Sequence, residues 1–485
     1  MSYDVAVIGC GVVGAAAAYQ LARYQLNTVV LEAQNDVANG TTKANSAIIH
    51  AGYDPEPGTL MAELNVRGNQ MTGEICRKLD VPFERVGSFV LAFDDADLQS
   101  IRTLYQRGVA NGVPDQQLLT GDEARALEPT LSPEVKGALY APSAGIISPW
   151  EFALAMAETA VVNGVELVRS APVTGIQREE GGYCLTTPQG SFHAKYVLNA
   201  AGVFADQVHA LLEDPGWSIH PVRGEYYLMD KSQNSQAKRV IFQCPNQNGK
   251  GVLVAPTIHG NLIVGPNAET IGDKKDLGTS SQGQNFVRRM AVKSIPGLDF
   301  RESIRNFAGL RAVSSRDDFI LEESATAPGF IDLAGIKSPG LSSAPAIGLY
   351  ALHLLEQAGL ALHIKSTFVD SRQHLVFKEL DAPAKNALIQ KDPRYGRVIC
   401  RCETITEGEI VAALHSPIPP CSVNGVKRRC NAGMGRCQGG FCGPRVQAII
   451  ARELGIPEQD VCIDQAGSYI LTGETKQSKG GNQDV

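Results

Sequence analysis

Four cysteines near the C-terminus have the spacing of a metal or iron–sulfur site. Cys400 and Cys402 form a C-x-C motif, and after 34 residues Cys437 and Cys442 form a C-x4-C motif. Four thiolates on two tight turns hold either an iron–sulfur cluster or a zinc ion. The second pair lies in the glycine-rich run 433–442, whose backbone N–H groups are available to the sulfur atoms of a cluster. This favours a [2Fe–2S] cluster over zinc.

The remaining cysteines are not expected to form a disulfide framework. Seven of the eleven cysteines fall between Cys400 and Cys462, which indicates a local metal site rather than a stapled fold. Cys421, Cys430 and Cys462 have no assigned role, and Cys430 is close enough in sequence to be an alternative ligand.

The N-terminus has the pattern of a dinucleotide-binding turn. An apolar strand runs into G-x-G-x-x-G at Gly9, Gly11 and Gly14, followed by a helix over 15–24. The glycines allow a tight turn, a close approach to a pyrophosphate and close packing of helix on strand. A second strand ends at Glu32, whose carboxylate suits a ribose 2′-OH and disfavours NADP.

The segment after Glu32 is polar and is predicted to start a helix. Thr41, Thr42, Asn45 and Ser46 are expected to donate to a second part of the cofactor. A redox dinucleotide and a cysteine cluster in one chain suggest that electrons pass from one to the other.

Two later segments resemble the cofactor-contact segments of the D-amino-acid-oxidase-like flavoprotein superfamily. They are 197–206, a strand that ends in small residues, and 333–342, which precedes a helix over 344–355. The resemblance implies FAD rather than NAD, although the glycines of 333–342 also suit ordinary turns. It implies cofactor contacts, besides those above, at Val173, Ala201, Gly202, Gly335, Gly340 and Leu341.

The segments 45–62, 221–227, 262–267 and 309–313 resemble L-2-hydroxyglutarate oxidases and dehydrogenases, over roughly residues 1–370. The C-terminal motifs, in 399–442, are similar to the bacterioferritin-associated-ferredoxin-like [2Fe–2S] domain. The large subunit of anaerobic glycerol-3-phosphate dehydrogenase has such a domain in the same place, and the whole architecture resembles that subunit.

One position departs from the glycerol-3-phosphate dehydrogenases. Those enzymes typically have an Arg after the His-x-Gly motif, whereas His50-Ala-Gly is followed here by Tyr53 and Asp54. An aspartate that faced the pocket would oppose a phosphate. This difference favours a substrate with a carboxylate but leaves glycerol 3-phosphate open.

Oxidation of an alcohol by a flavin needs a base for the hydroxyl proton and a hydride path to the flavin. We predict His50 as that base, with a purely structural imidazole as the alternative. Arg311 is the predicted anchor for a substrate anion, since guanidinium binds carboxylate through two hydrogen bonds. Tyr53, Arg223 and Lys337 are predicted to line the pocket. For Arg223 the alternative is an internal pair with Glu225, and for Lys337 a solvated side chain.

Composition limits the class of protein. The chain has 485 residues, of which 44% are hydrophobic and 20% charged, as in globular proteins, and a net charge of −7 argues against nucleic acid. Residues 394–455 carry nine Lys and Arg against four Asp and Glu, which suits an anionic cluster. No signal peptide or membrane-spanning run is visible. We expect a cytoplasmic protein, peripheral to the membrane only through a partner, and oligomerisation is left open.

The expected fold class combines α/β and α+β. A Rossmann-like FAD domain contains an inserted antiparallel sheet over the substrate, and a small helical [2Fe–2S] domain follows. The expected domain bounds are 1–80, 148–215 and 305–370 for FAD, 81–147 and 216–304 for substrate, 371–395 for a linker, 396–463 for the cluster, and 473–485 for a disordered tail.

The leading functional hypothesis is an FAD dehydrogenase for a small hydroxy substrate, either glycerol 3-phosphate or a 2-hydroxy acid such as L-2-hydroxyglutarate. Its electrons leave through the cluster to a partner protein or a quinone. One alternative is an amine or amino-acid dehydrogenase of the same superfamily. Another is a non-catalytic electron-transfer subunit of a larger complex.

Overall fold

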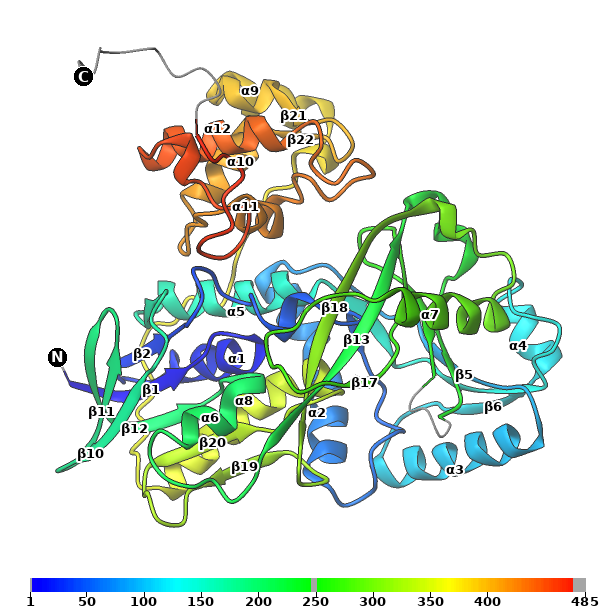
Figure 1. Cartoon of the computed structure of the whole chain (residues 1–485), viewed down its shortest axis with the longest axis horizontal. Coiled ribbons are helices and arrows are strands. Elements are labelled where there is room, and N and C mark those ends of the chain that lie inside the picture. The colour runs from blue at the N-terminus through cyan, green and yellow to red at the C-terminus, as the bar shows by residue number, and fades with distance from the viewer. Residues whose placement is uncertain (1, 246–250, 474–485) are drawn as a thin grey trace, which may run out of the picture. The chain divides into compact units, whose positions relative to one another are not determined.

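A computed structural model describes residues 2–245 and 251–473, which form two compact units. The first unit comprises residues 1–33 and 37–374, and the second comprises 34–36 and 375–485 (Figure 1). Within the described ranges, no helix has the length and apolar character needed to cross a membrane.

The first unit begins with a mainly parallel sheet that carries the glycine turn. Strand β1 (Ser2–Ile8) pairs in parallel with β2 (Thr28–Leu31) and with β12 (Gly190–Asn199). Val5, Ala6 and Val7 are fully buried because helices cover both faces of such a sheet. The other strands of this sheet are β9 (Glu166–Val168), β10 (Gly175–Glu179), β11 (Gly182–Thr187), β19 (Ile320–Glu323) and β20 (Phe330–Ala334).

Helix α1 (Val12–Leu21) packs against α5 (Pro149–Val162) and α8 (Gly340–Gln357), and α8 also packs against α2 (Leu60–Leu79). The run of alanines from Ala15 to Ala18 is buried, which lets α1 approach its neighbours closely. The short helix α6 (Ala205–His209) follows β12. These are the helices of a Rossmann-like layer.

A second sheet of nine strands is almost entirely antiparallel. Its longest strands, β13 (Ile219–Met229) and β18 (Ser303–Ser314), pair along their whole length (Figure 1). The other strands are β5 (Ser88–Ala92), β6 (Gln117–Thr120), β7 (Gly137–Ala141), β14 (Val240–Gln243), β15 (Leu253–Pro256), β16 (Leu262–Gly265) and β17 (Glu269–Thr270). Its core includes residues from α4 (Gly121–Leu127) and α7 (Ser281–Ser294), while α3 (Asp95–Asn111) packs on β5 and β7.

A small three-stranded sheet stands next to the candidate site. It consists of β3 (Ile48–Ile49), β8 (Gly145–Ile147) and β4 (Phe83–Glu84), with β8 in the middle. Strand β3 leads directly to His50, so this sheet fixes the main chain just before the predicted base.

The second unit is mainly helical. It contains α9 (Ala382–Lys391), α10 (Glu407–Leu414), α11 (Val423–Cys430) and α12 (Gly443–Leu454), with a two-stranded sheet of β21 (Val398–Cys400) and β22 (Ile405–Thr406). Its core of aliphatic residues, among them Ile410, Val426 and Ile450, is fully buried. Thr406 and Glu409 form a capping box that starts α10.

The expected fold class is confirmed, while two of the expected boundaries lie elsewhere in the structure. The second sheet extends through β18 to Ser314, beyond the expected limit at 304, because β18 pairs with β13 up to that residue. The second unit starts at Leu375, so α9 of the expected linker belongs to it. Of the expected tail, 474–485 lies outside the described residues.

Candidate active site and cofactor centres

The glycine turn after β1 has the shape of a phosphate cradle. Gly9 has a φ of +97°, and a Cβ at Gly14 would lie 2.0 Å from the Gly9 carbonyl oxygen. Helix α1 therefore begins as close to β1 as the backbone allows, with its N-terminal N–H groups at the turn. The Val12 N–H donates to Thr42 Oγ1 at 3.0 Å, so a distant hydroxyl caps this helix.

Glu32 lies at the end of β2 and is buried. Its Oε2 accepts a hydrogen bond from the Cys10 N–H at 2.7 Å, which fixes the carboxylate beside the glycine turn. A glycine turn, a helix N-terminus and an acidic residue at this strand end match the requirements of an adenine dinucleotide.

The polar segment after Glu32 is held in place by its own side chains. Thr41 Oγ1 donates to the Leu310 carbonyl at 2.8 Å, and Asn45 Nδ2 donates to the Thr42 carbonyl at 2.8 Å. Ser46 Oγ lies 3.4 Å from the hydroxyl of Tyr226. These residues shape the segment that leads to His50 and tie it to β13 and β18.

The other predicted cofactor residues gather at the carboxyl ends of strands of the first sheet or just beyond them. In an open α/β sheet, this is the edge where ligands bind. Ala201 and Gly202 follow β12, Gly335 follows β20 with a φ of +66°, and Gly340 and Leu341 begin α8. Val173 lies in the loop after β9 and packs against the core of this sheet.

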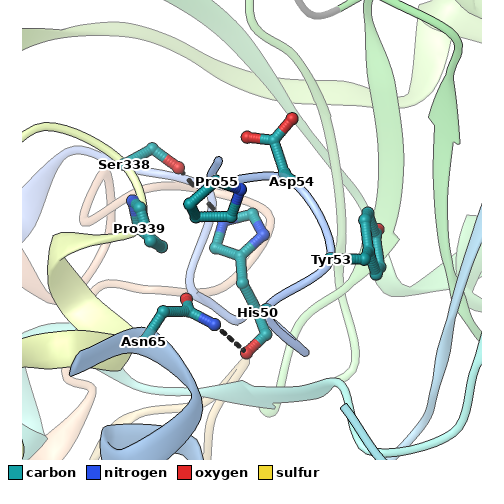
Figure 2. Close-up of a pocket in the computed structure, with 8 residues that line it drawn as sticks. His50, Tyr53, Asp54, Pro55, Asn65, Ser338 and Pro339 are labelled. Atoms are coloured by element: carbon teal, nitrogen blue, oxygen red, sulfur yellow. Dashed lines mark hydrogen bonds between the residues drawn. The ribbon is translucent and has the colours of Figure 1, made fainter. Parts of the chain in front are cut away.

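His50 is fixed through both its main chain and its ring. Its N–H donates to Ser342 Oγ at 2.7 Å, and its carbonyl accepts from Asn69 Nδ2 at 2.9 Å and from Asn65 Nδ2 at 3.3 Å. The imidazole Nε2 lies 3.3 Å from Ser338 Oγ (Figure 2). Phe242 stacks on the imidazole, with 5.7 Å between the ring centroids.

A small hollow that opens to solvent borders this imidazole. Its lining residues are His50, Gly52, Tyr53, Asp54, Pro55, Asn65, Ser338 and Pro339. Figure 2 shows the ring of Tyr53 and the carboxylate of Asp54 directed away from the imidazole. Burial raises the pKa of Tyr53, and its hydroxyl lies 3.3 Å from Ser88 Oγ.

The two predicted pocket arginines have different surroundings. Arg223 is buried and pairs with Glu269 at 2.7 Å and with Asp276 at 2.6 Å, so its charge is already compensated. Hydrogen bonding to Glu269 raises its pKa further. Glu225 has other partners, because it accepts hydrogen bonds from the N–H and the hydroxyl of Ser280 at the start of α7.

Arg311 is half-buried on β18 and has no ion-pair partner within the described residues. A Cβ at Gly224 would lie 3.2 Å from its Nη2, so the glycine makes room for the guanidinium. Its Nη1 approaches the Asn267 carbonyl at 3.5 Å. Arg311 is not among the residues that line the hollow around His50.

Lys337 lies half-buried in the turn before α8, between Gly335 and Gly340. Main-chain hydrogen bonds from Lys337 to Gly335 and from Gly340 to Lys337 close this turn. The side chains of Tyr226 and Tyr227 diverge as expected for neighbours on a strand, with Tyr226 stacked on Phe307 and Tyr227 against Phe300.

In the second unit, the four predicted ligands form two pairs of thiols. Cys402 Sγ lies 3.5 Å from Cys437 Sγ, and Cys400 shares a hydrogen bond with Cys442. A tetrahedral zinc site with Zn–S bonds of 2.3 Å would bring all four sulfurs to about 3.8 Å from one another. Among the described residues, no three of these sulfurs meet within 4.8 Å of one another. Two pairs fit a cluster in which each of two irons takes two ligands.

Backbone N–H groups surround these sulfurs. The Gly433 N–H donates to Cys400 Sγ at 3.5 Å, and the Phe441 N–H lowers the pKa of Cys437. A Cβ at Gly435 would lie 2.4 Å from the Cβ of Cys402, so only glycine fits where the two loops meet. These contacts suit negatively charged thiolates.

The spare cysteines are not part of this arrangement. Cys430 is buried in α11, donates to the Val426 carbonyl, and has its pKa raised to about 12 by burial. Cys421 donates to the carbonyl of Asn35, and Cys462 is half-buried with its main chain bridged to Ser422.

Residues 4–354 match the FAD dependent oxidoreductase family, which is well over half of the chain. The chain belongs to this FAD-dependent oxidoreductase family. The oxidoreductase also matches the BFD-like [2Fe-2S] binding domain over residues 398–452. FAD and a [2Fe–2S] cluster are therefore its cofactors, as the sequence predicted, and the two matches lie in different units.

Similar proteins cover one or both units of the oxidoreductase. A glycerol 3-phosphate dehydrogenase of Caloramator mitchellensis is 51% identical over 98% of this chain and 99% of its own. An L-2-hydroxyglutarate dehydrogenase of Escherichia coli (strain K12) is 31% identical over 55% of this chain and 64% of its own. The dithionite-reduced L-alpha-glycerophosphate oxidase of Mycoplasma pneumoniae, solved with FAD bound, has a TM-score of 0.73 at 30% identity, over 76% of this chain and 98% of its own.

Sequence reasoning missed the residues that hold His50. Ser338 contacts its ring, while Ser342, Asn65 and Asn69 hold its main chain. The spacing of Asn65 and Asn69, four residues apart on one helix face, was an available signal. The serines are separated from His50 by almost 300 residues, and nothing local in the sequence connects them.

Proposed function

We propose that this oxidoreductase oxidises a small secondary alcohol that carries an anionic group, and that glycerol 3-phosphate is its substrate. The observation that carries the proposal is His50, which borders a hollow and has its main chain fixed by three other side chains. An imidazole in this position is suited to take the hydroxyl proton near neutral pH. Bound FAD accepts the hydride from the substrate carbon.

Ser338 and the two predicted cationic residues have separate proposed tasks. Ser338 orients the imidazole through its contact with Nε2. Arg311 binds the substrate anion, because its guanidinium is half-buried and has no carboxylate partner in the described structure. Lys337, in the turn before α8, is proposed to add a second positive charge.

Two observations favour phosphate over carboxylate. The relative with 51% identity extends over both units and is a glycerol 3-phosphate dehydrogenase, whereas the L-2-hydroxyglutarate relative matches just over half of the chain. Asp54 lines the hollow, but its carboxylate is directed away from the imidazole (Figure 2), which lessens the expected repulsion of a phosphate.

The cluster gives the proposed reaction an exit for its electrons. Two electrons leave the substrate together, and a [2Fe–2S] cluster carries them onward singly. The acceptor is proposed to be a partner protein, with a quinone as the alternative.

An anaerobic flavin-bleaching screen tests the substrate. Purified holoprotein is mixed with glycerol 3-phosphate, L-2-hydroxyglutarate, lactate, malate or an amino acid, and the flavin absorbance is followed. We expect rapid bleaching by glycerol 3-phosphate. Bleaching by L-2-hydroxyglutarate alone would move the proposal to 2-hydroxy acids, and bleaching by amino acids alone would reject an alcohol substrate.

A further inference from the structure

A large aromatic side chain is exposed on the loop that holds the cluster. Phe441 lies between Cys437 and Cys442 and is 88% exposed, more than any other large apolar residue in the described structure. The second unit has an apolar core of its own, and Phe441 is outside it. The exposed ring therefore contributes nothing to the packing of this unit.

The exposed charges next to the cysteine ligands are all positive. Arg401 separates Cys400 from Cys402, Arg436 precedes Cys437, and Arg445 is three residues after Cys442, and all three arginines are exposed. The carboxylate in this neighbourhood, Glu403, is buried and lies 3.8 Å from Lys378.

Helix stability does not explain these arginines. Arg445 is in the first turn of α12, where the helix dipole disfavours a cation, and that turn contains no acidic residue. Neither Arg401 nor Arg445 forms an ion pair within the described ranges. Solvent and salt screen such exposed charges, which limits their effect on the cluster itself.

We propose that Phe441 together with Arg401, Arg436 and Arg445, here called the exit face, is the docking surface for an acidic one-electron carrier protein. Aromatic and arginine side chains are the residue types that most often dominate binding energy at interfaces. Opposite charge on the carrier steers it to the cluster and makes association depend on salt. A second copy of this chain that docked through the same face would present like charges and is disfavoured.

This inference rests on the proposed function for the origin of the electrons. Each docked carrier, in its oxidised form, takes one electron from the reduced cluster, and the cluster returns to its oxidised state. Two carriers are reduced for each alcohol oxidised to a ketone, and two protons are released. No other oxidant is required.

The first test measures binding without turnover. Oxidised holoprotein is titrated with an acidic plant-type [2Fe–2S] ferredoxin as the probe, and with basic cytochrome c as the charge control. We expect the ferredoxin to bind, with an affinity that falls steeply as salt rises. Phe441→Ala and the charge reversals Arg401→Glu and Arg445→Glu should each weaken binding about tenfold or more.

Matched control variants come from helix α3 in the first unit. Val109→Ala removes another exposed apolar side chain, and Arg102→Glu reverses another exposed arginine. Both should bind ferredoxin like the unchanged protein. Equal losses of ferredoxin affinity in the two control variants would overturn the proposal. Ferredoxin binding that depends neither on salt nor on any of the three exit-face substitutions would also overturn it.

The second test separates the steps by stopped flow. In Phe441→Ala, flavin reduction by glycerol 3-phosphate and cluster reduction should keep their rates, while ferredoxin reduction slows. If Phe441→Ala instead slows reduction of the cluster, the exit face serves electron transfer within this chain and the proposal is wrong. If glycerol 3-phosphate never reduces the flavin, the proposed function fails, whereas the binding titration still decides whether the exit face docks a carrier.

Discussion

The two units hold their redox groups in different ways. In the first unit, the dinucleotide cradle is made by backbone shape, since Gly9 and Gly14 create a turn in which a side chain would collide with main chain. In the second unit, four thiols provide bonds to the cluster, and the backbone only supplies N–H groups around them. The dinucleotide site therefore depends on the space left where glycines have no side chain, and the cluster site depends on four sulfur atoms.

This difference predicts how each site responds to substitution. A site built from bonds is lost with one ligand, while a site built from many weak contacts loses affinity by degrees. The same contrast separates Arg311 from Arg223, because one guanidinium is available to a ligand and the other already has two carboxylate partners.

The largest expected effect is loss of the cluster in Cys437→Ser. The variant should retain FAD and reduce it with substrate, but should contain no iron and transfer no electrons to a protein carrier. Iron analysis and the visible spectrum after anaerobic purification measure this. Cys430→Ser is the matched control, since Cys430 is buried in α11 and donates to the Val426 carbonyl, and it should keep the full iron content at a stability cost of about 1 kcal/mol. Iron retained in Cys437→Ser would show that the ligand set is wrong.

His50→Gln tests the proposed base. Loss of a general base typically reduces the rate by about 10²–10⁴-fold, and the variant should also lose the acidic limb of the pH profile of flavin reduction. Stopped-flow measurement from pH 5.5 to 9 gives both quantities. Ser338→Ala should keep the limb but shift its midpoint, because Ser338 acts on the rate only through the imidazole. If the pH profile of His50→Gln is unchanged, His50 is not the base and its role is structural.

Arg311→Gln and Arg223→Gln compare the two arginines directly. Loss of a charged hydrogen-bonding partner costs about 1.5–3 kcal/mol, so Arg311→Gln should raise the KM for glycerol 3-phosphate by about 10–150-fold. Arg223→Gln should instead lower the melting temperature, because it leaves Glu269 and Asp276 without their counter-ion, and its KM should change little. The reverse pattern would exchange the roles of the two residues.

The smallest expected effect is that of Thr42→Val. This change removes the acceptor of the Val12 N–H at the start of α1 while it keeps the side-chain volume. An unpaired N–H at this place should lower stability by about 1–3 kcal/mol and weaken FAD binding a few-fold. Thermal unfolding and FAD titration of the apoprotein measure the two effects, and an unchanged melting temperature would show that solvent or FAD replaces the hydroxyl.

The sequence predicted best those features that depend on neighbours along the chain. The glycine fingerprint, Glu32 and the cysteine spacing are local patterns that indicated a dinucleotide and a metal or iron–sulfur site, and the resemblance of two later segments to flavoproteins implied FAD; both cofactors are confirmed. Which of the two arginines has carboxylate partners was not predictable, because Glu269 and Asp276 are 46 and 53 residues away from Arg223. Likewise, the limit of the second sheet at Ser314 depends on pairing with a strand more than 70 residues earlier.

The arrangement of the four thiols has a consequence for the lifetime of the protein. A cluster held by both motifs closes the chain between Cys402 and Cys437 into a loop, and a cross-link of this length restricts the unfolded chain by about 4 kcal/mol. Oxygen that destroys the cluster would therefore also remove this cross-link. In air, the second unit should become the first target of proteases, so the same sulfur atoms that hold the cluster also set how long the folded unit lasts.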